Sequence, residues 1–182
     1  MVLFDTSVIV AIIDQNPKAP LDPQTQLPLL KFKERVEFLI ETLSSANETI
    51  IVPTPVLSEF LVKAGPNRDD YVTQFHASRH LQVVPFDERS AIELAFLNDP
   101  DLNGGKRLDP KTTWAKVKLD RQIVAIAKTN RASRIYAGDT DLATCARNNG
   151  IQTIMTWELP EPPIRDEDRQ VCIPFKMPDE EA

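Results

Sequence analysis

The sequence predicts an α/β protein with a parallel sheet that helices cover on both faces. Two observations predict this. Short apolar runs alternate along the chain with segments in which apolar residues recur at helical spacing. Strands that alternate with helices form parallel sheets, and strands buried on both faces are continuous apolar runs. The length of 182 residues, with 42% hydrophobic and 26% charged residues, suits one domain with a sizeable core.

The first half of the chain supplies two strands and three helices. Residues 2–5 predict a buried strand and residues 7–14 a helix, whereas four prolines make residues 15–30 an excursion from the core. A helix follows, with apolar residues at positions 32, 36, 39, 40 and 43. The strand 49–52 leads into Pro53-Thr54-Pro55, where we expect Thr54 to cap a helix over 56–64. Gly65-Pro66 ends that helix.

The second half continues the alternation. Helices are expected at 69–78, 87–97, 116–130 and 141–149, and strands at 81–84, 134–137 and 151–156. Residues 98–113, with Gly104-Gly105, predict a second irregular insertion. We therefore expect one folded domain, 1–157, followed by a proline-rich acidic tail, 158–182. The tail carries eight acidic and three basic residues, so it holds −5 of the net charge of −6 and leaves the domain nearly neutral.

The sequence also indicates the cellular compartment of the protein. No basic region precedes the apolar start, and no apolar run approaches the roughly 20 residues that a membrane helix needs. Cys145 and Cys172 form neither a disulfide framework nor a metal-type pair. We therefore expect a cytoplasmic protein without a membrane segment.

Five acidic residues lie where carboxylates are costly. Asp5 ends the first strand, and Asp139 and Asp141 follow the strand 134–137. Glu59 and Asp120 share helix faces with apolar residues, which makes an unpaired charge there expensive. Because ligands of parallel sheets bind beyond the carboxyl ends of the strands, we expect these acids to converge at one edge.

Converging carboxylates repel one another, and divalent cations remove that repulsion. An all-oxygen site suits Mg²⁺ or Mn²⁺, so we expect Asp5, Asp120, Asp139 and Asp141 as metal ligands. The hydroxyl of Thr6 or Ser7 would orient a carboxylate or a bound water. Each acid also has a purely structural reading. Asp5, or one of Asp139 and Asp141, could cap a helix, and Asp120 could form a buried salt bridge or occupy a helix N-cap. Glu59 could pair with Lys63 four residues on.

Four motifs together resemble the PIN-domain nucleases, which include the VapC-type toxins. They are Phe4-Asp5-Thr6-Ser7, Glu59 in the helix after the second strand, the segment Leu119-Asp120-Arg121-Gln122-Ile123-Val124-Ala125-Ile126-Ala127, and Gly138-Asp139-Thr140-Asp141-Leu142. The resemblance covers roughly residues 1–156. It implies a Rossmann-like three-layer α/β/α sandwich with a mostly parallel sheet, Mg²⁺ or Mn²⁺ dependence and endoribonuclease activity. It also implies the catalytic acids Asp5, Glu59, Asp120 and Asp139, an antitoxin partner and a homodimer.

The chain departs from the family pattern in three respects. The family often has Thr or Ser two residues before the fourth acid, where this chain has Ala137. The excursion at 15–30, the insertion at 98–113 and the tail are longer than in compact toxins. These departures bear on the toxin role more than on the chemistry.

A basic segment precedes the Asp120 helix. We expect it to guide an RNA backbone into the site, with a tryptophan offering a stacking surface; a merely solvated surface would have the same composition. The acidic tail could compete with RNA for it. The residues are Lys106, Arg107, Lys111, Trp114, Lys116, Lys118 and Arg121.

Three functions fit these residues. The first is hydrolysis of RNA phosphodiester bonds by a metal-activated water, in a toxin or an RNA-processing enzyme. The second is a catalytically inactive PIN-like module that binds RNA or protein. The third is an aspartyl-phosphate enzyme of the haloacid dehalogenase kind, but that chemistry normally needs an acid where this chain has Ser7. The sequence leaves the RNA target and the cleavage position open.

Overall fold

The computed structural model describes residues 1–99 and 113–163, and the side chain of Trp114 is not among the described groups. Five parallel strands form one sheet in the order β3-β2-β1-β4-β5. The predicted parallel sheet is thus confirmed. The strands are β1 (Val2–Phe4), β2 (Ile50–Pro53), β3 (Leu81–Val84), β4 (Arg134–Ala137) and β5 (Gln152–Met155).

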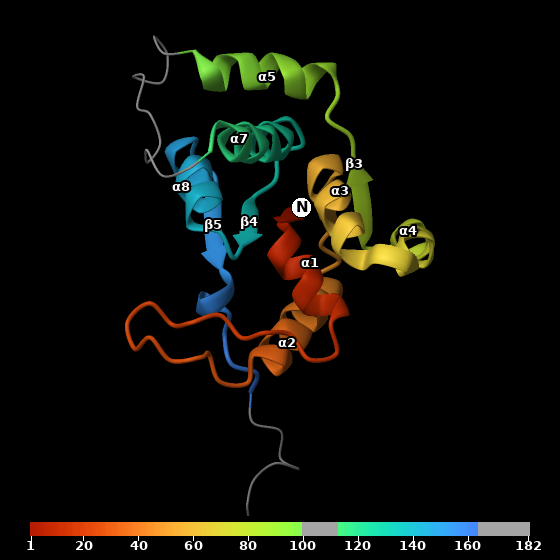
Figure 1. Ribbon diagram of the computed structural model, residues 1–182, viewed down its shortest axis with the longest axis vertical. Coiled ribbons are helices and arrows are strands. Elements are labelled where there is room, and N and C mark those ends of the chain that lie inside the picture. The colour runs from red at the N-terminus through yellow and green to blue at the C-terminus, as the bar shows by residue number, and fades with distance from the viewer. Residues whose placement is uncertain (100–112, 164–182) are drawn as a thin grey trace, which may run out of the picture.

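Helices connect the strands and cover the sheet (Figure 1). The helices α5 and α7 lie side by side at the top of Figure 1, and α1 packs on α2 and α3 lower down. The helices are α1 (Thr6–Ile13), α2 (Phe32–Ser45), α3 (Thr54–Ala64), α4 (Arg68–Ala77), α5 (Glu88–Asn98), α7 (Trp114–Thr129) and α8 (Thr140–Asn148). Two short 3-10 turns, η1 (Gly65–Asn67) and η2 (Thr156–Glu158), complete the described elements.

The sheet reverses its strand order at β1. From β1 the chain moves outward to β2 and β3, and then returns to place β4 on the other side of β1. Phe4 pairs with Tyr136 in register, and the backbone N–H of Asp5 donates to the Tyr136 carbonyl at 3.0 Å. The segments that follow β1 and β4 therefore leave the sheet next to each other, at the kind of switch point where parallel sheets bind ligands.

The core explains the apolar runs in the sequence. All three residues of β1 have no exposed surface, and Phe4 packs edge-to-face on Tyr136 with ring centroids 5.4 Å apart. The segment Ile123–Ala127 of α7 is also buried. Because α7 is buried along this stripe, the face that carries Asp120 is directed into the protein.

The predicted N-cap of α3 is wrong. Thr54 is the first residue of α3 and Pro53 occupies the N-cap position. The Thr54 hydroxyl instead accepts a hydrogen bond from the Phe86 backbone N–H at 3.1 Å, so it fastens the segment after β3. The helix α8 begins at Thr140, because Asp139 caps it.

The excursion at 15–30 is a fixed loop beneath the sheet (Figure 1). An isolated antiparallel bridge joins Leu21 to Pro28, and Asp22 Oδ1 accepts hydrogen bonds from two backbone N–H groups within the loop. Lys33 Nζ, from α2, donates to the Gln15 carbonyl at 2.9 Å. Side-chain contacts from α2 therefore hold the excursion against the domain.

The chain stays packed beyond the expected domain end at residue 157. Leu159 is buried and its carbonyl accepts a hydrogen bond from Arg35. Glu161 forms ion pairs with Lys31 and Arg35. The first residues of the segment 158–182 thus lie against α2, and the residues from 164 onward lie outside the described part of the chain.

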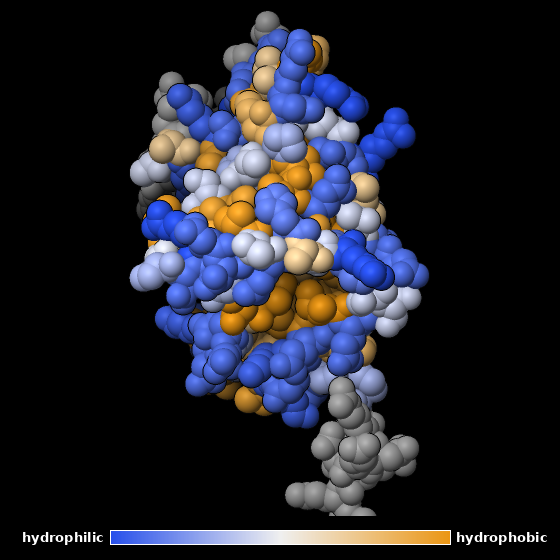
Figure 2. Space-filling model, turned by 90° about the vertical axis from the view of Figure 1, so that its right-hand side faces the viewer, coloured by the Kyte–Doolittle hydropathy of each residue, from blue (hydrophilic) through white to orange (hydrophobic). Residues whose placement is uncertain are grey.

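The face shown in Figure 2 carries many hydrophilic residues around an apolar hollow in its lower half. Within the ranges 1–99 and 113–163, no helix combines the length and the hydropathy that a membrane crossing requires.

Candidate acidic site

Asp5 is held rigidly at the start of α1. It is 7% exposed and occupies the N-cap position, where its Oδ1 accepts a hydrogen bond from the Thr6 N–H at 2.6 Å. Its Oδ2 accepts from the Ser7 hydroxyl at 3.0 Å and from the Gly138 N–H at 3.4 Å. Burial raises the pKa of Asp5 above its ordinary value, against the lowering effect of these hydrogen bonds. Asp5 thus caps α1, as one interpretation of the sequence expected, and its second oxygen also accepts a hydrogen bond from a hydroxyl.

Gly138 fits closely against Ser7. The Gly138 N–H donates to the Ser7 hydroxyl oxygen at 2.8 Å. A Cβ atom at position 138 would lie 2.7 Å from Ser7 Oγ and 2.9 Å from Ser7 Cβ, closer than real contacts allow. The absence of a side chain at this position therefore lets the strand-to-helix turn after β4 touch the segment after β1. Ala137, where the family often has a hydroxyl, is fully buried.

Glu59 reaches the same region from α3. Its Oε2 accepts a hydrogen bond from the Thr6 hydroxyl at 2.7 Å, and its Oε1 pairs with Lys63 Nζ at 3.0 Å. Burial alone would raise the pKa of Glu59, but the hydrogen bonds from Lys63 and Thr6 outweigh it and hold the pKa below its ordinary value. The expected i,i+4 pair is present, and Thr6 also links Glu59 to the residue after Asp5.

Asp120 is the acid of this group with a buried carboxylate oxygen that lacks a hydrogen bond among the described residues. It lies on the buried face of α7 and is 5% exposed, and its Oδ2 has no hydrogen-bond partner among the described residues. Burial, with added repulsion from Asp139, raises its pKa from 3.8 to about 7. A buried carboxylate oxygen without a donor is costly in a folded protein unless something else compensates it.

Asp139 and Asp141 share one cation. Asp139 Oδ1 caps α8 by accepting hydrogen bonds from the N–H groups of Asp141 and Leu142, at 2.7 and 3.3 Å. The other oxygen, Oδ2, lies 2.8 Å from Lys116 Nζ, which is also 2.8 Å from Asp141 Oδ2. These contacts raise the pKa of Lys116. The cap is therefore Asp139, and the ammonium group stands between two of the expected ligands.

The structure brings all five acids into one electrostatic cluster. The charges of Asp139, Asp141 and Asp5 each raise the pKa of Asp120, Glu59 raises that of Asp5, and Asp139 acts on Glu59. Within the described part of the chain, however, no three His, Cys, Asp or Glu side chains are positioned to hold a metal ion together. The ion pairs of Lys63 and Lys116 give a physical reason, because each ammonium group draws carboxylates toward itself.

The predicted RNA-binding segment is described only in part. Lys106, Arg107 and Lys111 lie outside the described residues, and so does the side chain of Trp114. Lys118 is exposed on α7, and Arg121 hydrogen-bonds the side chain of Asn98.

Lys116 has a role that sequence reasoning missed. We expected it at an RNA surface, and it lies in the acidic cluster instead. A signal was present, because Lys116 stands four residues before Asp120 and shares its helix face. Helical spacing alone would have paired Lys116 with Asp120 rather than with the two acids of α8.

A five-stranded parallel sheet that carries carboxylates at its switch point defines the α/β Rossmann-like PIN fold, and solved structures agree. A chain of the VapBC2 complex from Rickettsia felis, bound to promoter DNA, matches with a TM-score of 0.54 and 14% identity over 85% of this chain and 98% of that chain. A chain of the DNA-bound VapBC complex from Salmonella typhimurium matches with a TM-score of 0.54 and 16% identity over 86% and 99%.

A third neighbour is VapC20 from Mycobacterium tuberculosis, described as a toxin that cleaves the sarcin-ricin loop. It matches with a TM-score of 0.50 and 14% identity over 79% of this chain and 94% of that chain. No family model and no curated protein matches this sequence. At such low identities, the neighbours show the fold that this chain shares with them.

Proposed function

We propose that the protein is an Mg²⁺- or Mn²⁺-dependent endoribonuclease. The observation that carries the proposal is the buried Asp120 oxygen without a partner, on the face of α7 that meets Asp5 and the acids of α8. The fold shared with VapC20, a toxin that cleaves the sarcin-ricin loop, supports the same class of chemistry.

The side chains suit a divalent cation. All the donors are oxygens, which Mg²⁺ and Mn²⁺ prefer, and burial, with repulsion from neighbouring carboxylates, raises the pKa values of Asp5 and Asp120, so a cation there would offset a real cost. Asp5, Asp120 and Asp139 would hold the ion, with Asp141 as an additional ligand. When bound, it would supply an activated water and would offset the charge that develops on the phosphate.

The chain's own residues orient this site. The Ser7 hydroxyl and the Gly138 N–H fix Asp5 Oδ2, and the Thr6 hydroxyl fixes Glu59. Glu59 would accept a proton or position a water at the edge of the cluster, where Lys63 keeps it ionised. Lys116 would leave its place between Asp139 and Asp141 and could then face a phosphate oxygen.

The neighbours suggest partners as well. Two of them are described as VapBC complexes bound to DNA, so we extend the proposal to an antitoxin partner. A toxin role, a homodimer and a cytoplasmic location remain proposals of the same kind.

A second function has a specific observation in its favour. Lys116 and Lys63 already pair with three of the five acids, which is what an inactive PIN-like module for RNA or protein would need. It leaves the unpaired, buried Asp120 oxygen unexplained, so we rank it second.

One experiment separates the two. Single-stranded and structured RNA are incubated with wild type and with Asp5→Asn, in Mn²⁺ and in EDTA, and both proteins are checked for folding by circular dichroism. If the proposed site hydrolyses RNA, wild type should cleave it in Mn²⁺. Neither wild type in EDTA nor the folded Asp5→Asn variant should cleave it. Cutting in EDTA, or full activity of Asp5→Asn, would reject it. RNA retention without any cleavage would favour the inactive module.

A further inference from the structure

A cavity of about 310 Å³ lies beside the acidic site. Residues of α1, the first residue of α2 and the proline-rich excursion line it, and Ser7 and Gly138 are also among its lining residues. Both of these residues also hydrogen-bond Asp5 Oδ2. Two residues of the cavity lining therefore contact the carboxylate that we place in the catalytic site.

Lys63 makes a second connection. Its side chain lines the cavity and its Nζ lies 3.0 Å from Glu59 Oε1. A molecule in the cavity would thus be in contact with partners of two of the proposed catalytic acids. The cavity and the acidic cluster adjoin each other closely enough to act on one substrate.

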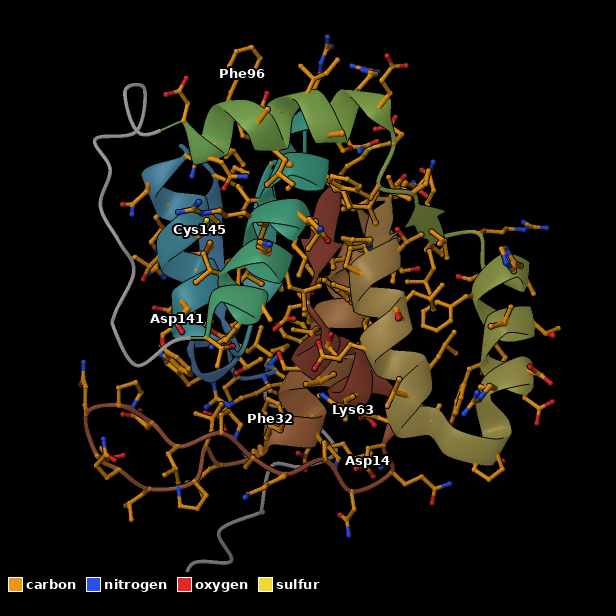
Figure 3. The ribbon with its side chains drawn as sticks, turned by 45° about the horizontal axis from the view of Figure 1, so that its top comes forward. Asp14, Phe32, Lys63, Phe96, Asp141 and Cys145 are labelled. Carbon is orange, nitrogen blue, oxygen red and sulfur yellow. The ribbon has the colours of Figure 1, made fainter. Side chains whose placement is uncertain are left out.

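The lining of the cavity combines apolar and charged residues. Val10 and Phe32 contribute apolar surface, together with Ala11 and two prolines, and Lys18 and Lys63 are the basic residues of the lining. Asp14 is the one acid among the lining residues. In Figure 3, Asp14, Phe32 and Lys63 come from three different elements and lie close together, away from Asp141.

The outer wall is a fixed part of the fold. Pro17, Lys18 and Pro20 belong to the excursion, and the Pro20 carbonyl accepts a hydrogen bond from the Leu29 N–H at 2.9 Å. The contact of Lys33 with Gln15 anchors the start of this segment. Since prolines also restrict the backbone, the cavity is preformed rather than created by a ligand.

We propose that this cavity holds one unpaired nucleotide of the RNA substrate, next to the phosphate that the acidic site cleaves. The inference rests on the proposed function. Sequence-specific proteins recognise RNA mainly through unstacked bases, which stack on aromatic side chains while cationic groups contact the backbone, and Phe32 is the aromatic residue of this lining. A largely apolar cavity of nucleotide size with two lysines, lined in part by residues that contact Asp5 and Glu59, has this chemistry. The substrate is then a single-stranded segment or a loop.

The test uses a short single-stranded RNA and a series of copies that each lack one base. Cleavage is measured, and binding is measured separately by fluorescence anisotropy, which reports on the cavity whether or not cleavage occurs. The proteins are wild type, Val10→Phe, which fills the cavity, and Lys18→Glu, which alters its rim without repacking. Ile12→Phe is the matched control, because Ile12 lies on the same helix, is 37% exposed and does not line the cavity. Thermal melting verifies that each variant is folded.

For wild type, loss of the base at one position should weaken binding about tenfold, the scale of one base packed on a protein surface. Val10→Phe should bind the intact RNA about tenfold more weakly and should not respond to the missing base, and Lys18→Glu should also bind more weakly. Ile12→Phe should behave as wild type. Equal binding of all copies by wild type, or unchanged RNA binding by Val10→Phe, would overturn the inference. Absence of cleavage with the position-specific binding intact would instead refute the nuclease function alone.

Discussion

Lys116 Nζ lies 2.8 Å from Asp139 Oδ2, and the same ammonium group is 2.8 Å from Asp141 Oδ2. A protein cation thus stands between two of the carboxylates that would bind a divalent ion. Because one ammonium carries a single charge, it neutralises the cluster only in part, and burial together with the remaining carboxylates keeps the pKa of Asp120 raised. Metal binding at this site would have to displace Lys116.

Replacing Lys116 should therefore strengthen metal binding and weaken the metal-free fold. In Lys116→Met the two carboxylates repel, and since the lysine is 40% exposed we expect a loss of about 1 kcal/mol, or about 3 °C in melting temperature. In this variant Mn²⁺ no longer has to break the Lys116 ion pairs, which are worth about 1 kcal/mol. The dissociation constant of Mn²⁺ should therefore fall about fivefold. Calorimetric titration and thermal melting measure both. Lys118→Met, on the same helix, is the control; weaker Mn²⁺ binding by Lys116→Met would show that the lysine supports the site instead.

Asp120 should make the metal-free protein less stable as the pH rises. Its pKa is 3.8 in the unfolded chain and about 7 in the fold, so the folded protein holds the proton more tightly. The free energy of unfolding should then decline between about pH 4 and pH 7, by an amount on the order of a few kcal/mol, and level off above pH 7. Urea unfolding in EDTA across this range measures it.

Asp120→Asn gives the matched comparison. The amide has no proton to lose, so this variant should lack the decline and should exceed wild type most clearly above pH 7. Parallel pH profiles of the two proteins would mean that Asp120 does not carry the raised pKa.

Gly138→Ala should disturb the site through Ser7. The added Cβ must displace a side chain that donates to Asp5, so we expect cleavage to fall at least tenfold, the scale of a lost contact behind a metal ligand. Gly150→Ala is the control, since nothing lies within 4 Å of its added Cβ and only its φ of 77° makes it unfavourable. It should lose about 1 kcal/mol of stability and keep full activity. Equal activity of Gly138→Ala and wild type would contradict the role assigned to this contact.

The hydroxyl of Thr6 should matter more than its methyl group. Thr6→Val removes the 2.7 Å hydrogen bond to Glu59 and keeps the shape of a side chain that is 2% exposed. We expect about tenfold slower cleavage for Thr6→Val and near-normal cleavage for Thr6→Ser. Steady-state rates in Mn²⁺ measure both variants. If Thr6→Ser loses as much as Thr6→Val, packing rather than the hydrogen bond is at work.

Much of this arrangement could be predicted because local patterns determine it. The apolar runs identify buried strands, and helical spacing places Asp120 with Ile123 and Val124 on a buried face. Asp5 and Asp139 could be predicted at the same edge of the sheet, because strands of a parallel sheet share one polarity. The strand order, which sets β4 beside β1, did not follow from the residues.

The details that escaped prediction depend on contacts between distant segments. Thr54 is a good capping residue, yet its hydroxyl binds Phe86 after a different strand. Asp139 uses one oxygen as a cap and the other for Lys116, and no sequence pattern divides a carboxylate in this way. The cavity beside Ser7 needs three elements at once, including an excursion whose prolines indicate only an irregular loop.

The claim that distant carboxylates form one divalent-metal site is tested most directly by crystals soaked in Mn²⁺ and measured for anomalous scattering. We predict a peak bonded to Asp5 and Asp120 and reached by Asp139, with Lys116 moved away from it. No peak among these carboxylates at saturating Mn²⁺, with Lys116 still between Asp139 and Asp141, would contradict the claim.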